Sequence, residues 1–289
     1  MWPVVELIMG PTASGKTEYA IERARKIGAR ILSVDSLLVY RQLNIGSAKP
    51  SADLLQEIPH YGINLIDLES PFSVIDYRRV ARQAIKETRS LQVPLLIVGG
   101  SFFYLRALFT DPYDAPATDP KIGQELNARV KEDGLRTLYK ELVSLDPKCA
   151  GKINPNDQYR IIRALAIYYQ TGKKLSFFSS KSKPLARPEW IKEIKIFSPE
   201  KELLKTRVIE RTFQMLNHGL VEEVEDIKTK GYSLSLRPLQ SVGYREVGEY
   251  LEGRISKDVL PEKIVQSTTQ LAKRQMTWMR NHFAEFLTV

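Results

Sequence analysis

Residues 10–17 read Gly-Pro-Thr-Ala-Ser-Gly-Lys-Thr and match the phosphate-loop pattern G-x-x-x-x-G-K-S/T. The apolar run at residues 4–9 predicts a buried strand before this segment, and a helical pattern follows at residues 16–27. Glycines let backbone N–H groups curl around a phosphate at a helix N-terminus, where the helix dipole favours negative charge. In such a loop Lys16 would supply a charge to the terminal phosphate, and the Thr17 hydroxyl would bind Mg²⁺. The segment therefore predicts a site for a di- or triphosphate.

Two features distinguish the chain from an ordinary nucleoside triphosphatase. The predicted strand at residues 94–98 ends at Gly99-Gly100, where such enzymes carry a Mg²⁺-binding acid, and the sequence has no Asn-Lys-x-Asp base-reading motif. An acid does stand at the end of the predicted strand at residues 30–34, namely Asp35. A carboxylate there could hold a metal-bound water or accept a proton, because ligands bind at the carboxyl ends of parallel strands. A turn or helix-capping aspartate is an equally good interpretation.

The elements that must position these residues alternate between strand and helix. Strands are predicted at residues 4–9, 30–34, 63–68 and 94–98, and helices at residues 16–27 and 73–90. Ser73 and Asp76 suit the first turn of the second helix as a capping pair. This order predicts an α/β fold of the P-loop type, with a mostly parallel sheet flanked by helices.

The pattern changes after residue 111, where prolines interrupt the chain and helical periodicity then dominates. A helix is predicted from Asp157 to Thr171, and residues 191–197 are predicted to return to the sheet as a strand. Further helices are predicted at residues 200–217 and from Pro261 onward. We therefore expect a catalytic core of residues 1–116 and 196–289, with a helical domain of residues 117–195 inserted into it.

The positive charge of the chain is concentrated in this insertion. The net charge is +9, and residues 148–195 hold eleven Lys and Arg against three acids, which accounts for +8 of it. Aromatic residues are interleaved with these cations: Tyr159, Tyr168, Tyr169, Phe177, Phe178 and Trp190. Cations that neutralise phosphates and rings that stack on bases are typical of nucleic-acid binding. A solvated basic face is the alternative interpretation.

Composition also excludes several classes of protein. The one cysteine, Cys149, cannot form an internal disulfide, and the histidines lie far apart, without the spacing of a zinc site. No apolar run approaches the roughly 18 residues that a membrane span needs. The first residues lack the basic and apolar segments of a signal peptide. We expect a cytoplasmic protein without membrane contact.

A series of motifs, in order along the chain, is similar to a known family. Beyond residues 10–17, the series includes Asp35-Ser-Leu-Leu-Val-Tyr-Arg, Ile45-Gly-Ser-Ala-Lys-Pro and Val98-Gly-Gly-Ser. It continues with Asn154-Pro-Asn-Asp, Ser241-Val-Gly-Tyr-Arg-Glu and Gln270-Leu-Ala-Lys-Arg-Gln. Together these blocks resemble the bacterial tRNA dimethylallyltransferases, also called tRNA isopentenyltransferases, over nearly the whole chain.

The resemblance implies a reaction that accounts for the missing triphosphatase features. Enzymes of that family transfer a dimethylallyl group from dimethylallyl diphosphate to N6 of the adenosine that adjoins the anticodon on its 3′ side in tRNA. Pyrophosphate leaves, Mg²⁺ assists, and no nucleoside triphosphate is consumed. The phosphate loop would then bind a leaving group, and the basic insertion would bind the anticodon stem-loop of tRNA, whose target base must leave its stack.

The resemblance also assigns roles to individual residues. It implies that Asp35 accepts the proton of the amine and that Thr12 and Lys16 assist catalysis, with Thr17 on the metal. The diphosphate would contact Gly10, Thr12, Ala13, Ser14, Gly15, Lys16, Thr17 and Arg207. The tRNA would contact Asp35, Ser36, Leu37, Leu38, Ser101, Tyr159, Arg160, Ile161, Ile162 and Arg163. A solvated helix arginine is the alternative interpretation of Arg207.

Other functions fit parts of the sequence. A prenyltransferase that acts on free adenine nucleotides would not need the long basic insertion. A small-molecule kinase would turn over ATP, and an RNA-binding protein with a decayed site would bind tRNA without reaction. The leading hypothesis is a monomeric tRNA prenyltransferase that uses Mg²⁺. Gly123 and Thr269 stand where the family commonly carries arginines.

Overall fold

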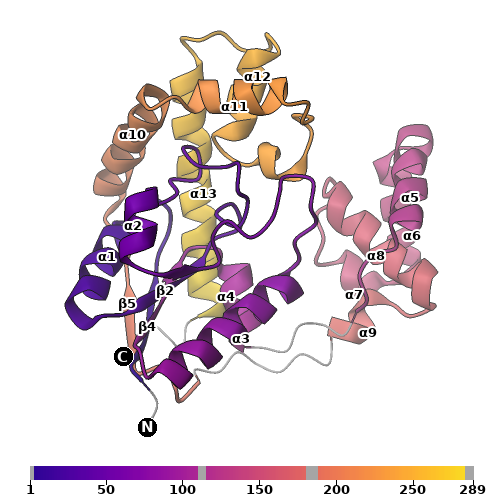
Figure 1. Ribbon diagram of the computed structural model, residues 1–289. Helices are drawn as coiled ribbons and strands as arrows, with labels where there is room; N and C mark the ends of the chain where they lie inside the picture. Colours follow the sequence, from indigo (N-terminus) through magenta and orange to yellow (C-terminus); the bar gives the residue numbers. More distant parts are fainter. Residues whose placement is uncertain (1–2, 110–114, 180–187, 284–289) are drawn as a thin grey trace. The chain divides into compact units, whose positions relative to one another are not determined.

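The computed structural model describes residues 3–109, 115–179 and 188–283 (Figure 1). The chain divides into two compact units, one formed by Met1–Phe109 with Leu185–Val289 and the other by Thr110–Pro184. The second unit ends before the expected boundary at residue 195, because Glu193–Ile196 forms the strand β5 in the sheet of the first unit. Each unit has its own apolar core.

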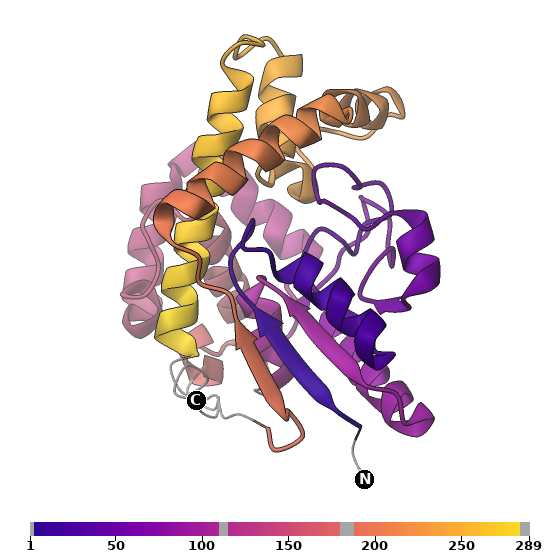
Figure 2. The ribbon, with the colours of Figure 1, turned by 90° about the vertical axis from the view of Figure 1, so that its left-hand side faces the viewer.

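The first unit is built on a parallel sheet of five strands in the order β3-β2-β4-β1-β5. The strands are β1 (Val5–Met9), β2 (Arg30–Val34), β3 (His60–Tyr61), β4 (Leu95–Gly99) and β5 (Glu193–Ile196). In register, Met9 and Val34 both lie beside Gly99, so β1, β4 and β2 end at one edge of the sheet. Figure 2 shows β5 beside β1 at the other side of β1 from β4. The predicted α/β fold is confirmed.

The strand predicted at residues 63–68 is wrong. The third strand is the short β3, and residues 63–68 contribute only the isolated bridge between Ile66 and Tyr40. The backbone turns at Gly62, whose φ of 82° is a left-handed conformation. The N–H groups of Leu65 and Ile66 then both donate to the carbonyl of Val39, which lies in the loop after β2 and outside the sheet.

Helices cover both faces of the sheet because the strand side chains alternate in direction. Leu7 and Met9 pack with α3 (Val74–Leu91), whereas Ile8 packs with α1 (Lys16–Ile27), so β1 carries apolar side chains on both faces. Its one charged residue, Glu6, is buried and pairs with Arg23 of α1. Both helices have the ends that the sequence predicts. Gly28 ends α1 in a left-handed conformation, and Ser73 forms a capping box with Asp76 at the start of α3.

The remaining elements of the first unit follow in chain order. They are α2 (Ala52–Glu57), α4 (Phe102–Phe109), α10 (Lys201–Asn217), α11 (Leu220–Thr229), the 3-10 helix η1 (Arg237–Gln240), α12 (Tyr244–Leu251) and α13 (Leu260–His282). Figure 2 shows α10 and α13 side by side beyond the ends of β1 and β5. These two long helices are the ones predicted at residues 200–217 and from Pro261 onward.

The described part of the second unit contains helices and no strands. Its elements are α5 (Pro120–Asp133), α6 (Leu135–Leu145), α7 (Pro147–Ala150), α8 (Gln158–Thr171) and α9 (Leu175–Ser179). Asp157 caps α8 by accepting from the backbone N–H of Arg160, and Gly172 ends this helix, as predicted. Leu138, Leu142 and Leu165 are buried in its core.

Across the described ranges 3–109, 115–179 and 188–283, no helix combines the length and the apolar character that crossing a membrane requires.

The close contact between β2 and β4 at Gly99 leaves no room for a side chain. Adding one methyl group there should therefore destabilise the fold severely. A Cβ at residue 99 would lie 2.2 Å from the carbonyl oxygen of Val34, so we expect Gly99→Ala to destabilise the fold by about 2–3 kcal/mol. At Gly123 in α5, a Cβ would meet one methyl group at 3.7 Å, and Gly123→Ala should be neutral or stabilising. Urea unfolding of the two variants measures both effects, and equal midpoints would contradict the packing argument.

Candidate active site

The phosphate loop joins β1 to α1 and has the backbone geometry of an anion site. Ala13 and Gly15 have φ angles of 58° and 87°, and left-handed residues of this kind form anion-binding nests of N–H groups. Gly15 also precedes the first turn of α1, so the helix N-terminus faces the loop. A Cβ on Gly10 would lie 2.7 Å from the carbonyl oxygen of Phe197, which explains glycine at the start of the loop.

A buried hydroxyl in this loop has no protein partner. Ser14 is 2% exposed, and its Oγ makes no hydrogen bond within the described residues. A buried polar atom without a partner costs free energy, which an oxygen of a bound phosphate would recover. The residues predicted for the diphosphate are therefore brought together, and this hydroxyl fits such a ligand.

Positive charge gathers around the loop from two helices. The Lys16 amine donates to the carbonyl of Pro11 at 2.9 Å, and Arg207 of α10 donates to the carbonyl of Ser14 at 2.9 Å. Arg207 also lies close to Gly15, because a Cβ there would be 3.1 Å from its guanidinium. Arg207 is thus a contact of the loop, and a solvated arginine does not describe it.

Arg211, which lies one helical turn after Arg207, was not among the site residues predicted from the sequence. Burial lowers the pKa of its guanidinium, and the charges of Asp35 and Glu18 partly offset this. Burial, followed by the charge of Arg211, lowers the pKa of Lys16 to about 8. Within the described residues, Arg211 makes no hydrogen bond, so two neighbouring half-buried cations lack a full counter-charge. The i, i+4 spacing of the two arginines was the signal that could have revealed this residue.

Asp35 follows β2 and faces the same cations. Its Oδ1 accepts from the backbone N–H groups of Leu37 at 2.7 Å and Leu38 at 3.4 Å, which is a turn geometry. Its Oδ2 makes no hydrogen bond with any residue that the structure describes. Both interpretations of this aspartate are therefore compatible, since one oxygen fixes the turn and the other can accept a proton.

The residues predicted for the acceptor base lie at the joined ends of β2 and β4. The N–H of Ser101 donates to the carbonyl of Val34 at 3.1 Å, which holds Ser101 beside the residue that precedes Asp35. Ser36 is exposed, and Leu37 and Leu38 are half-buried. Tyr104, on α4, stacks on Tyr77 at 4.5 Å between ring centroids. Burial, followed by the nearby Tyr40, raises the pKa of Tyr104 to about 12, so its hydroxyl stays protonated.

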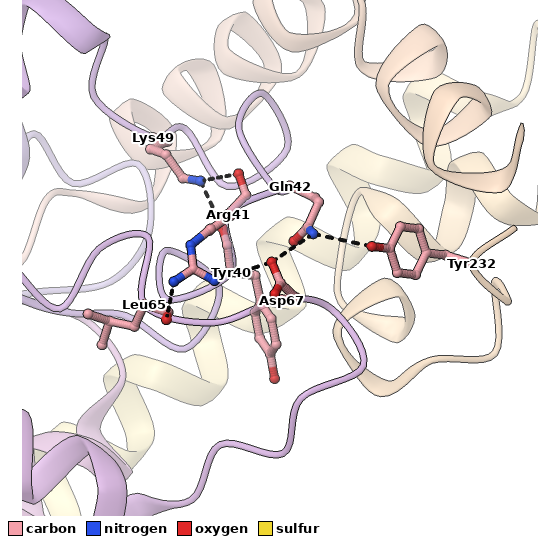
Figure 3. Close-up of polar contacts among 7 residues, drawn as sticks. All are labelled: Tyr40, Arg41, Gln42, Lys49, Leu65, Asp67 and Tyr232. Carbon is pink, nitrogen blue, oxygen red and sulfur yellow. Dashed lines mark hydrogen bonds and ion pairs between the residues drawn. The ribbon is translucent and has the colours of Figure 1, made fainter. Parts of the chain in front are cut away.

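The loop after Asp35 is fixed by side chains along its length (Figure 3). The Lys49 amine donates to the carbonyls of Tyr40 at 2.8 Å and Arg41 at 3.1 Å, and burial lowers its pKa to about 8. The Arg41 guanidinium donates to the carbonyl of Leu65 at 2.7 Å and to Asp67 at 3.2 Å. These contacts give the loop a defined shape.

A carboxylate on α11 fixes the far end of the same loop. Glu223 accepts from the Ile45 N–H at 2.8 Å and from the Tyr244 hydroxyl at 2.7 Å, and the N–H groups of Asn44 and Gly46 also donate to it. A Cβ on Gly46 would lie 2.6 Å from the Tyr244 ring. Glu223 belongs to no motif in the sequence, because its backbone partners at residues 44–46 lie more than 170 residues away along the chain.

The chain offers few ligands of its own to a metal ion. The Thr17 side chain is exposed and forms no hydrogen bond among the described residues. In the same residues, no group of three His, Cys, Asp or Glu side chains could hold a metal. Mg²⁺ retains several waters and binds through one or two protein groups together with substrate phosphates. The hydroxyl of Thr17 fits an ion bound in that way.

In the second unit, the residues predicted to contact tRNA differ in their exposure: some side chains are buried and others are exposed. Ile161 and Ile162 are 0% and 7% exposed and belong to the helical core, so their side chains cannot contact RNA. Arg163 is half-buried and donates to the Thr118 hydroxyl at 2.6 Å and to a backbone carbonyl. Tyr159 is 59% exposed, and the exposed Arg160 pairs with Asp157 at the start of the helix. Of the predicted tRNA contacts in this unit, these two have exposed side chains.

A parallel α/β sheet whose first strand leads through a cation-lined glycine loop into a helix is a fold of the P-loop type. The family model described as IPP transferase matches residues 38–282, and the chain belongs to this family of prenyltransferases.

The tRNA dimethylallyltransferase of Geobacter metallireducens is 38% identical over 274 residues, which cover 95% of this chain and 88% of the relative. The tRNA isopentenylpyrophosphate transferase of Bacillus halodurans is 30% identical, with a TM-score of 0.65 and coverage of 97% of this chain and 88% of that one. A eukaryotic dimethylallyltransferase acting on tRNA is 25% identical, with a TM-score of 0.78 and coverage of 96% and 70%. The resemblance noted in the sequence is confirmed.

The pKa of Lys16 predicts a proton linkage in anion binding. With a pKa of about 8, the free amine is charged at pH 7 and largely neutral at pH 9. A phosphate favours the charged form, so pyrophosphate binding should take up a proton at pH 9, and the affinity should fall as pH rises above 8. Calorimetry in buffers of different ionisation enthalpy measures the uptake.

Lys16→Met provides the control, because the protonation of free pyrophosphate is the same in the experiments with both proteins. The variant should lack the extra proton uptake at pH 9. Equal uptake by the two proteins would show that Lys16 does not titrate in the site.

Proposed function

We propose that this chain transfers a dimethylallyl group from dimethylallyl diphosphate to N6 of the adenosine on the 3′ side of the anticodon in tRNA, releasing pyrophosphate. We further propose that it acts with Mg²⁺, as a cytoplasmic monomer. The observation that carries the proposal is that Asp35, at the end of β2, interacts electrostatically with Lys16 of the phosphate loop and Arg211 of α10, because β1, β4 and β2 end at one edge of the sheet. Cations for a leaving diphosphate and a base for an attacking amine then lie in one site.

The leaving group determines what the cations do. As the C1–oxygen bond of the donor breaks, negative charge grows on the diphosphate, and Lys16, Arg207 and Arg211 stabilise it. These side chains are half-buried, which strengthens the stabilisation because water screens their charges less than it would on an open surface. The loop N–H groups and the free hydroxyl of Ser14 add donors that need no rearrangement. A bound Mg²⁺, which Thr17 would help to hold, supplies further charge neutralisation on the diphosphate oxygens.

The attacking group determines what Asp35 does. The N6 amine of adenine is a poor nucleophile because its lone pair is delocalised into the ring. As N6 forms its bond to C1 of the dimethylallyl group, one of its protons must leave, and Oδ2 of Asp35 accepts it. The two backbone N–H groups on Oδ1 keep the carboxylate oriented during this transfer.

Replacing this carboxylate by its amide tests the proposal. Asp35→Asn keeps the acceptor for the Leu37 N–H and removes the base, so we expect kcat to fall by about 10²–10⁴-fold. The exposed Asp53→Asn in α2 is the matched control and should retain full activity. The measurement is the incorporation of labelled dimethylallyl into unmodified tRNA. Equal rates for Asp35→Asn and wild type would contradict the role of this carboxylate.

Arg160 is an exposed cation on α8, and its removal should change the kinetics in a different way from the removal of the Asp35 carboxylate. If Arg160 contacts a tRNA phosphate, Arg160→Ala should raise the KM for tRNA several-fold and leave the KM for the donor unchanged. The slope of log affinity against log salt should also fall by about 1. Arg136→Ala, an exposed arginine on α6, is the control and should change neither quantity. A loss of the same size in both variants would indicate a general charge effect.

A further inference from the structure

A glutamine on the last helix bridges two segments of the site. Gln275 lies on α13, where its Oε1 accepts from the backbone N–H of Thr12 at 2.8 Å. Its Nε2 donates to the carbonyl of Gly100 at 3.0 Å. One side-chain amide therefore connects the phosphate loop to the residue that follows β4. We propose that Gln275 is a positioning residue, which sets the diphosphate loop against the acceptor end of the sheet; this inference rests on the proposed function.

The three segments that meet at this amide are in close contact. A Cβ on Gly100 would lie 2.7 Å from the carbonyl oxygen of Gly10 and 3.0 Å from Nε2 of Gln275. The start of the loop, the end of β4 and the side chain from α13 thus leave no room for a methyl group. Such packing transmits a shift of one segment to the others, because close-packed interiors do not deform freely.

Hydrogen bonds extend this connection to the proton acceptor. Ser101 follows Gly100, and its N–H donates to the carbonyl of Val34 at 3.1 Å, next to Asp35. A path of backbone and hydrogen bonds therefore runs from Thr12 through Gln275 to Asp35. The reaction needs the leaving diphosphate and the acceptor amine at a fixed separation, and misplacement by about 1 Å can cost 10²-fold in rate.

The type of the residue matters, because the bridge needs an acceptor and a donor at one position. An ionised glutamate keeps the acceptor for Thr12 and loses the donor to Gly100. A methionine of similar length keeps neither. Buried apolar residues of the same helix, Ile264, Ala272 and Met279, hold α13 against the first unit independently of the amide. Loss of the bridge should therefore change the site and leave the fold intact.

The test compares Gln275→Met and Gln275→Glu with Gln270→Met, a substitution of an exposed glutamine on the same helix. In Gln275→Met, we expect kcat to fall by about 10–100-fold, with the KM for tRNA within 3-fold of wild type and little change in Tm. Hydrogen–deuterium exchange gives a second readout that needs no activity. Residues 10–17 should exchange faster in Gln275→Met and at the wild-type rate in Gln275→Glu, whereas kcat should fall in both.

The outcomes separate this inference from the proposed function. Wild-type protein that transfers no dimethylallyl group would contradict the proposed function, while faster exchange of the loop in Gln275→Met would still support the bridge. Wild-type kcat and loop exchange in both variants would overturn the positioning role. So would a large loss of Tm with faster exchange throughout α13, because the residue would then be structural. Gln270→Met should match wild type in every measurement.

Discussion

The rest of the site depends on the approach of two half-buried cations, Lys16 and Arg211. Burial lowers the pKa values of both groups, the charge of Arg211 lowers that of Lys16 further, and the charges of Asp35 and Glu18 compensate only in part. Such an arrangement costs free energy in the free protein, since charges removed from water must find counter-charges. In the reaction that we propose, a diphosphate supplies the missing negative charge, and that charge increases as the bond to the donor breaks. The arrangement that is unfavourable for the protein alone then becomes favourable as this reaction proceeds.

The parallel sheet makes this arrangement possible. Because β1, β4 and β2 end at one edge, the phosphate loop after β1 lies near the turn of Asp35 after β2. Gly99 and Gly100 stand at the end of β4, where a triphosphatase would carry an acid for Mg²⁺. The absence of side chains there lets the backbone of β2 and the start of the loop approach closely. Helices α10 and α13 then add Arg207, Arg211 and Gln275 from a distant part of the chain.

The elements predicted from sequence were those whose signals are local. Helix α1 with Gly28 and helix α3 with its capping box each depend on residues within one segment, and the structure confirms them. The predicted strand at residues 63–68 was wrong, because its apolar residues pack in a loop whose backbone bonds go to Val39.

The site residues that were missed or misassigned from the sequence depend on contacts between segments that lie far apart along the chain. Ile161 and Ile162 belong to a motif in the sequence, but their direction on α8 depends on the packing of α5 and α6. Arg211 and Gln275 reach the loop through the path of helices in three dimensions, and Gln275 lies 263 residues from its partner Thr12. No local pattern encodes such contacts.

In the reaction that we propose, the phosphate loop binds a prenyl diphosphate and no nucleoside triphosphate is consumed. The most direct test incubates the protein with Mg²⁺, unmodified tRNA, dimethylallyl diphosphate and ATP, and then quantifies prenylated adenosine, pyrophosphate and remaining ATP. We expect one pyrophosphate for each prenyl group in tRNA, with the amount of ATP unchanged. Consumption of ATP without prenylation of tRNA would contradict the proposed reaction.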